Sequence, residues 1–300
     1  MKAKLLIMLI GLILTGSIFS GGLSAQRFKT MSHAQIDSLL SVTATKNMTV
    51  TGRMQFYSEY FLNMPYNLVC AGDGPYALYE TYPLVNFAET NCMLYCEHVL
   101  ALAISDSWDN FFNNLQQIRY KEGMIGMRTR NHYTMADWLP QNMWLLSDAS
   151  RAVGADQTMQ VTRTISHQKF FAGKGITDMR YTLPDRTLTI DYIPKEALAG
   201  IAGNLRNGDI GALIFAGKED IFSAHMWMVF YVNGQPVIRE SSSSKMTTFD
   251  TPYSKWAEKI ANSQRYIGIS IMRIRPELDV PGKIILPWQI AGLHAEMDTQ

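Results

Sequence analysis

The residues best suited to chemistry in this sequence are a cysteine, a histidine and a glutamate that lie far apart along the chain. Cys92 stands at the start of a predicted helix, where free backbone N–H groups and the positive end of the helix dipole favour a thiolate. The same N–H groups can stabilise the oxyanion of a tetrahedral intermediate. With His225 and Glu240, Cys92 could perform acyl transfer through a thioester. The alternative is a buried structural cysteine, because free cysteines are commonly buried.

A predicted hairpin brings the histidine and the glutamate together. Asn233-Gly234 is the strongest short-range turn signal in the sequence, and a two-residue turn there pairs Trp227 with Glu240 and sets His225 opposite Ser242. Period-two alternation places His225, Trp227 and the diagonal Glu240 on one face. A carboxylate there would orient the imidazole and stabilise its protonated form, the third role of a Cys/His triad. A solvent-facing glutamate and a core histidine are the alternative.

The elements that must position these residues divide the chain into a mainly helical first part and a strand-rich second part. Helical patterns cover residues 36–45, 50–62, 92–104 and 106–120, with a loop rich in Gly, Pro and Tyr at 71–83. Either Asn91 or Thr90 is the expected N-cap of the helix at Cys92. Strands are predicted at 187–193, 209–215, 221–232, 236–240 and 266–274, with a short helix from Pro194 to about Leu205. Helices first and an antiparallel sheet second predict an α+β fold.

Composition excludes several classes of protein. The chain has 300 residues, of which 47% are hydrophobic and 18% charged, so it can bury a substantial core and is not disordered. Its net charge of +1 and the lack of a Lys/Arg run predict no nucleic-acid partner. Cys92, Cys96 and His98 lack a second pair of ligands, so neither a metal nor another cofactor is predicted. No repeat or linker divides residues 26–300, which we interpret as one domain.

The N-terminus has the parts of a secretory signal. Lys2 and Lys4 precede the apolar run from Leu5 to Leu14, and small residues lead to Ala25. Residues 1–25 are therefore predicted to be a signal peptide, and the mature protein is predicted to be exported, periplasmic or secreted, without stable membrane insertion. An uncleaved anchor is the alternative, because the uncharged stretch from Leu5 to Gln26 is long enough to span a bilayer.

Export bears on the three cysteines, because an oxidising compartment tends to pair them. Cys92 and Cys96 are four residues apart on one predicted helix, which holds their Cβ atoms too far apart for a disulfide. A bridge, if it forms, would join Cys70 to one of them and leave one thiol free. A leftover thiol in an exported protein is a candidate nucleophile.

Three stretches resemble a known family. Residues 91–97 (NCMLYCE), running into 99–103 (VLALA), resemble the nucleophile helix of the N-acetylmuramoyl-L-alanine amidase-like family, a branch of the NlpC-type papain-like cell-wall hydrolases. Residues 130–138 (RNHYTMADW) are similar to a second signature of that branch, and Met64-Pro65-Tyr66 resembles its upstream Pro-Tyr. The resemblance spans about residues 32–275. It implies a papain-like core of N-terminal helices packed on an antiparallel sheet, with insertions.

The resemblance also implies roles for individual residues. Tyr66 would help to complete the oxyanion hole. Four residues of the second signature would line or support the substrate cleft, although a structural turn pinned by aromatic rings is the alternative: His132, Tyr133, Asp137 and Trp138. The chain departs from the family pattern at Asn91, at Cys96, at Glu240, where the family has histidine, and at Trp227. The indole at Trp227 replaces a small residue and would narrow or block the cleft.

These observations predict an exported cysteine amidase that hydrolyses the N-acetylmuramoyl-L-alanine amide bond of peptidoglycan fragments. The choice of bond comes from the resemblance, since the residues themselves indicate only acyl transfer by a Cys/His pair. Three alternatives stay open: an endopeptidase that cleaves within the stem peptide, a non-catalytic muropeptide- or glycan-binding protein, and a structural surface protein.

Overall fold

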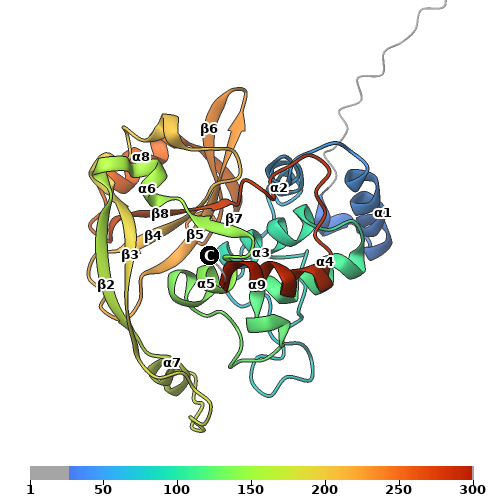
Figure 1. The fold of residues 1–300 in the computed structure, drawn as a ribbon, viewed down its shortest axis with the longest axis horizontal. Coiled ribbons are helices and arrows are strands. Elements are labelled where there is room, and N and C mark those ends of the chain that lie inside the picture. Colours follow the sequence, from blue (N-terminus) through green and yellow to red (C-terminus); the bar gives the residue numbers. More distant parts are fainter. Residues whose placement is uncertain (1–26, 299–300) are drawn as a thin grey trace, which may run out of the picture.

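The first half of the chain is mostly helical. The computed structural model describes residues 27–298, so the predicted signal peptide at 1–25 lies outside the described residues. The first four helices are α1 (His33–Ala44), α2 (Val50–Glu59), α3 (Cys92–Ala103) and α4 (Trp108–Arg119). They lie together on one side of the molecule (Figure 1). Within residues 27–298, no helix combines the length and apolar character needed to cross a membrane.

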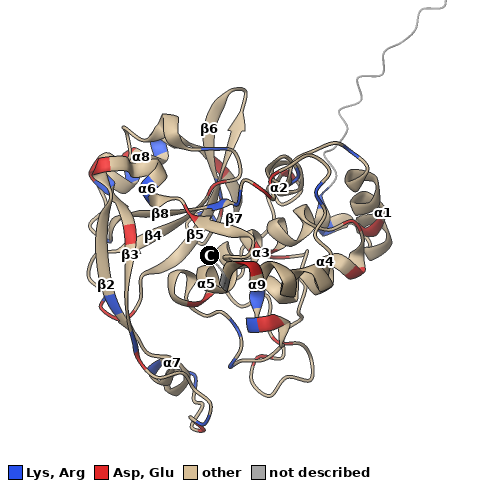
Figure 2. Cartoon of the chain, in the orientation of Figure 1, with Lys and Arg blue, Asp and Glu red and all other residues tan. Residues whose placement is uncertain are grey.

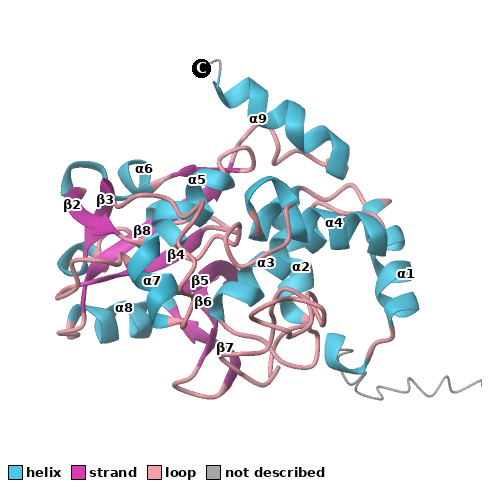
Figure 3. Ribbon diagram, turned by 90° about the horizontal axis from the view of Figure 1, so that it is seen from below, coloured by secondary structure: helices cyan, strands magenta, loops and turns pink. Residues whose placement is uncertain are grey.

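An antiparallel sheet forms the other side of the molecule (Figure 1, Figure 3). Its strands are β1 (Leu146–Asp148), β2 (Met159–Ile165), β3 (Arg186–Pro194), β4 (Ile210–Phe215), β5 (Ser223–Val232), β6 (Gln235–Ser242), β7 (Thr247–Pro252) and β8 (Tyr266–Ile274). The order is β2-β3-β8-β4-β5-β6-β7, with β1 beside β8, and all these pairs are antiparallel. The predicted α+β class with an antiparallel sheet is confirmed. The papain-like core and the single-domain boundaries stay predictions.

Short helices complete the fold. They are α5 (Leu139–Gln141), α6 (Ser150–Gly154), α7 (His167–Gly173), α8 (Tyr253–Ala261) and α9 (Ile290–Asp298). The long β2–β3 ribbon projects from the sheet and carries α7 toward its tip (Figure 1). Helix α1 begins earlier than predicted because Ser32 and Gln35 form a reciprocal capping box. Helix α2 ends at Glu59, before the predicted boundary at residue 62.

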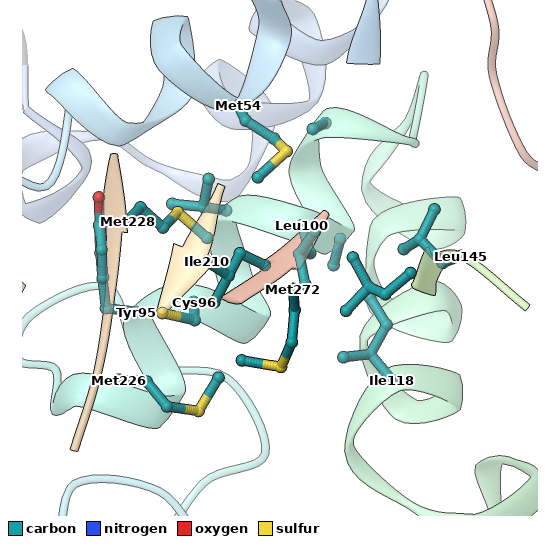
Figure 4. Close-up of a cluster of buried hydrophobic side chains, with 14 of the residues drawn as sticks. Met54, Tyr95, Cys96, Leu100, Ile118, Leu145, Ile210, Met226, Met228 and Met272 are labelled. Carbon is teal, nitrogen blue, oxygen red and sulfur yellow. The ribbon is translucent and has the colours of Figure 1, made fainter. Parts of the chain in front are cut away.

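Apolar packing fixes α3 against the sheet. Cys96 and Leu100 of α3 lie in one buried cluster with Met226 and Met228 of β5, and the labelled side chains point toward one another (Figure 4). Alternate residues of β5 face the other side of the sheet, where Trp227 joins a second cluster beneath α8. The two clusters bury both faces of β5, which holds the strand in place relative to α3.

The prediction that Trp227 lies beside a substrate cleft is wrong. Its side chain is 0% exposed, and its ring centroid lies 4.6 Å from that of Trp256 on α8. Gly211 on β4 makes room for the indole, because a Cβ atom at this position would lie 2.0 Å from the Trp227 ring. A strand pattern does not reveal that a helix covers its second face. The amphipathic spacing of Tyr253, Trp256, Ala257 and Ile260 was a signal for α8 that the sequence analysis did not use.

The Gly211–Trp227 contact makes a testable prediction. Gly211→Ala should lower the free energy of unfolding by about 1–3 kcal/mol, because the added methyl group overpacks the second core. Chemical denaturation measures the change. Gly217→Ala is the matched control, since nothing lies within 4 Å of a Cβ atom there. Equal stability of the two variants would contradict the close packing of Trp227.

Candidate active site

The thiol of Cys92 and the imidazole of His225 meet where the start of α3 approaches the start of β5. Each side chain shifts the pKa of the other through hydrogen bonding and charge, so the two groups interact directly. The Cys92 Sγ atom lies 3.9 Å from the Ala224 carbonyl oxygen. The backbone N–H groups of Met226 and Met93 also contribute to lowering the pKa of the thiol. Residues that are distant in the sequence are therefore brought together as predicted, while their catalytic roles stay predictions.

The N-cap of α3 sets the position of the thiol. The Asn91 side chain accepts a hydrogen bond from the Leu94 backbone N–H at 2.9 Å, which confirms Asn91 as the cap. Cys92 is thus the first residue of the helix, beside backbone N–H groups that have no partner within the helix. This location favours negative charge on the sulfur.

The β5–β6 hairpin places Glu240 behind His225. The Nε2 atom of His225 lies 2.5 Å from Oε2 of Glu240, which leaves Nδ1 for the sulfur. The turn residues Asn233 and Gly234 have φ angles of 50° and 74°, as a type I′ turn requires. The predicted register holds along the described ladder, which pairs Val232 with Gln235 and ends at the pair Met228–Arg239.

A β-bulge lies directly at the histidine. On β4, Ala212 pairs with Met226 but Ile214 pairs with Ser223, so β5 carries one extra residue in this interval. The Ser223 side chain accepts a hydrogen bond from the His225 backbone N–H at 3.3 Å within the bulge. Period-two alternation therefore does not extend from Trp227 to His225. Bulges redirect side chains near functional sites, and this one separates the half-buried imidazole from the fully buried indole.

Each partner of the Cys–His pair stabilises the charged form of the other. Burial opposes ionisation of the Cys92 thiol, but the hydrogen bond and the charge of His225 outweigh it and lower the thiol's pKa. Burial likewise opposes protonation of His225, yet its bonds to Cys92 and Glu240 raise the imidazole pKa to about 10. The site therefore favours a thiolate and an imidazolium at neutral pH, which are a nucleophile and an acid.

The other two cysteines differ sharply from Cys92. Within the described residues all three are free thiols, so Cys70 forms no disulfide there. Burial raises the pKa of Cys70 to about 11 and that of Cys96 well above its usual value. Cys92 is consequently the one described cysteine whose surroundings favour the thiolate.

The charge of Cys92 acts on two tyrosines. Tyr66 is half-buried, and a parallel bridge to Thr90 ties it to the turn that precedes α3. Burial raises the Tyr66 pKa, and the Cys92 charge adds to the effect. Sequence reasoning missed Tyr266, the first residue of β8, whose pKa is also raised by burial; the charge of Arg265 opposes this rise, and the charges of Glu240 and Cys92 add to it. No local motif marks Tyr266, because only sheet pairing brings it here.

Polar residues of the second signature, residues 130–138, form hydrogen bonds with other parts of the chain. The Asp137 carboxylate accepts from the Tyr133 backbone N–H at 3.1 Å, from His167 Nε2 at 2.9 Å and from Arg186 Nη2 at 2.6 Å. His132 bonds through Nε2 to the Met127 carbonyl at 2.6 Å. These contacts tie the segment to α7 and β3.

One residue of this signature is wrongly predicted. Trp138 is 0% exposed within the main core, so it cannot line a cleft. His132 packs against the Phe170 ring with centroids 4.3 Å apart, and burial lowers its pKa to about 4. Substrate contacts of His132, Tyr133 and Asp137 stay predictions, while the contacts described here support the rest of the chain.

Comparison with known proteins identifies the family. Residues 56–263 match the family model described as AmiA-like, N-acetylmuramoyl-L-alanine amidase-like. A Legionella pneumophila protein of known structure shares 22% identity, with 81% of this chain and 94% of that chain covered and a TM-score of 0.73. An N-acetylmuramoyl-L-alanine amidase from Bacteroides uniformis shares 24% identity over 75% of this chain and 99% of that chain, with a TM-score of 0.60. No curated protein matches the sequence.

The three thiols should react at very different rates. Iodoacetamide at pH 7 should alkylate Cys92 at least about tenfold faster than Cys70 or Cys96, because alkylation consumes the thiolate. His225→Ala should slow labelling of Cys92 by a similar factor, since its imidazolium partner is gone. Peptide mass spectrometry over a time course measures the rates. An equal rate of Cys92 labelling in the wild-type protein and the His225→Ala variant would contradict the ion pair.

Proposed function

Because the chain belongs to the N-acetylmuramoyl-L-alanine amidase-like family, we propose that it is a cysteine-dependent amidase. Its proposed reaction is hydrolysis of the amide bond that joins the lactyl group of N-acetylmuramic acid to L-alanine in peptidoglycan fragments. The observation that carries this proposal is the series Cys92–His225–Glu240, in which His225 interacts with the thiol and bonds to the Glu240 carboxylate. The family supports the choice of bond, and the geometry supports the use of a cysteine.

The proposed reaction has two steps. The Cys92 thiolate attacks the lactyl carbonyl carbon, and the C–N bond breaks as His225 gives its proton to the departing amine of L-alanine. Water, deprotonated by the now neutral His225, then hydrolyses the thioester and frees the sulfur. The Cys92 backbone N–H and the Tyr66 hydroxyl would stabilise the oxyanion in both steps. Glu240 holds the imidazole in position throughout.

Two further proposals concern the fold of the core and the export of the protein. Helix α3 carries its thiol at the N-terminus and packs on β5 and β6, an arrangement that supports a papain-like core of the NlpC type. The apolar segment that follows Lys4 supports export. Peptidoglycan lies outside the cytoplasmic membrane, so an exported enzyme would meet its substrate there. Sequencing the mature N-terminus would test cleavage after Ala25.

The two main alternatives, a non-catalytic binding protein and an endopeptidase, are now supported to different degrees. The non-catalytic alternative rested on an indole in the cleft and on the altered motif positions. The burial of Trp227 under α8 removes the first of these grounds. An endopeptidase would use the same catalytic residues on another amide bond. The products distinguish it from the amidase.

N-acetylmuramoyl-L-alanyl-D-glutamate should yield free N-acetylmuramic acid and the dipeptide L-Ala-D-Glu. Cys92→Ala should lower the rate at least about a thousandfold, because no other group can form the thioester. Mass spectrometry of the products measures both. Cys70→Ala is the control and should retain activity. Unchanged substrate would overturn the proposal, and release of D-Glu would favour the endopeptidase.

The pH dependence of kcat/KM should report the role of Glu240. The Glu240 carboxylate raises the pKa of His225. Glu240→Gln should therefore lower the His225 pKa and move the alkaline limb of the profile from near pH 10 downward by about 1–2 pH units. The Glu258→Gln variant on the exposed face of α8 should leave the profile unchanged. An alkaline limb that stays in place would show that Glu240 does not control the imidazole.

A further inference from the structure

A second cavity lies between two loops, apart from the catalytic residues. Residues 73–79 form one wall and residues 124–129 form the other. Its volume is about 580 Å³, which falls within the range of ligand-binding pockets, roughly 300–1,000 Å³. None of the three proposed catalytic residues lines this cavity. A ligand bound here would therefore be held separately from the reacting atoms.

The first of these loops is a fixed part of the fold. Its two ends meet just before α3, where the Thr90 backbone N–H donates to the Pro65 carbonyl at 3.0 Å. Farther along, the Asp73 backbone N–H donates to the Glu80 carbonyl at 2.8 Å, and the Asp73 carboxylate accepts from the buried Tyr120 hydroxyl at 2.8 Å. The loop is therefore pre-organised, which lowers the entropy cost of binding a ligand.

Large apolar and aromatic side chains on both loops are exposed to solvent. Four of them line the cavity, with exposed fractions of 100% for Tyr76, 84% for Leu78, 50% for Met124 and 40% for Tyr79. Within residues 27–298, neither tyrosine ring contacts another ring, and neither hydroxyl forms a hydrogen bond. An exposed apolar surface of this kind is typical of a binding site.

The charged groups of the cavity lining are already paired. Asp73 and Arg128 are the two charged residues that line it. Asp73 forms an ion pair with Arg130, and Arg128 lies 3.8 Å from Asp178. Residues 74–79 contain no charged side chain, whereas Lys and Arg are interleaved with Asp and Glu over the rest of the fold (Figure 2).

The partners of these two groups form further ion pairs. Arg130 also bonds Glu80, which in turn bonds Lys174, and Asp178 also bonds Arg180. Four cations thus face three carboxylates in this network. The side chains of Lys174 and Arg180 are 47% and 79% exposed and lie outside the lining, so solvent screens the surplus charge. A charged ligand would lose hydration without gaining an unpaired partner, which favours a neutral one.

A neutral saccharide matches this lining. The C–H face of a pyranose ring is apolar and can stack on an aromatic ring, while its hydroxyl groups can bond a tyrosine hydroxyl. Tyr76 and Tyr79 offer both kinds of contact, and neither is used within the described residues. A purely apolar partner would leave the two hydroxyl groups without a role. Peptidoglycan contains a sugar of the required kind, since N-acetylglucosamine is uncharged.

We propose that the cavity at Tyr76, Tyr79 and Met124 binds neutral N-acetylhexosamine residues of a glycan chain and anchors the enzyme to peptidoglycan. For the identity of the glycan, this inference rests on the proposed function. The tyrosines supply ring faces and hydroxyl groups, and the apolar wall at residues 124–127 packs against the sugar. Anchoring is separate from bond cleavage at Cys92.

Calorimetry with the intact protein and fully N-acetylated chitotetraose tests this binding. Tyr76→Ala should weaken binding about fivefold or more, because it removes a stacking face. Tyr76→Phe should retain most of the affinity, since it keeps the ring. Trp288→Ala is the control, because it removes a ring that is 72% exposed but lies outside the cavity. Since Tyr76 is fully exposed, its replacement should not disturb folding.

A charged ligand of the same length tests the preference for a neutral one. A hyaluronan tetrasaccharide, which contains glucuronate, should bind about tenfold or more weakly than chitotetraose, because its carboxylates find no unpaired cation. Raising NaCl from about 50 mM to about 500 mM should leave chitotetraose binding unchanged, since no ion pair contributes.

Four results would overturn the inference: no binding of chitotetraose, equal binding to Tyr76→Ala and wild type, hyaluronan binding as tight as chitotetraose, or a marked salt dependence. Analytical ultracentrifugation adds a fifth. Self-association that Tyr76→Ala abolishes would assign the cavity to a second copy of this chain.

The muropeptide cleavage assay separates failure of this inference from failure of the proposed function. Cleavage by a protein that does not bind chitotetraose would refute the anchoring site and leave the amidase standing. Chitotetraose binding that is equal in wild type and Cys92→Ala, without cleavage by the wild-type protein, would support the saccharide site and refute the amidase.

Discussion

The interaction between the Cys92 thiol and the His225 imidazole is the one on which the rest of the site depends. It joins a helix terminus to a strand, and neither element can position its side chain without the other. The required precision comes from packing: Cys96 and Leu100 of α3 interlock with Met226 and Met228 of β5. Close-packed cores have few alternative arrangements, so the apolar contact one turn behind the thiol limits where the sulfur can lie. The second core under α8 prevents β5 from moving away.

Glu240 is held by its neighbour on β6. Adjacent strand residues face opposite sides of the sheet, so Glu240 points toward His225 while Arg239 points toward the helices. Arg239 is 2% exposed, bonds Asp250 on β7 through Nε at 2.7 Å and donates to the Ser58 hydroxyl of α2 at 2.7 Å. This buried, fully partnered guanidinium pins β6 between β7 and α2. The orientation of the imidazole thus depends on an ion pair on the opposite side of the strand.

Local signals in the sequence were sufficient for some elements and insufficient for others. Asn233-Gly234 needs only its own backbone preference to form the turn, and Asn91 needs only the next N–H groups to cap α3, so both could be predicted. The bulge at His225 and the burial of Trp227 arise between elements that are distant in the chain. Likewise β2 and β7 were not predicted, although β2 is rich in β-branched residues; they pair with β3 and β6. The sequence predicted which residues meet, but not which side of the sheet each one faces.

The carboxylate at position 240 affects the two steps of the proposed reaction in opposite ways. A negative charge 2.5 Å from the ring makes the imidazolium a weaker acid, which disfavours proton transfer to the leaving amine. After that transfer the thiolate charge has been consumed in the thioester, and the neutral imidazole next to a carboxylate is a stronger base for water. A neutral residue at position 240 would reverse this preference. The Cys–His–Glu arrangement is therefore better matched to hydrolysis of the acyl-enzyme than to its formation, and the backbone donors at the start of α3 must contribute most to the first step.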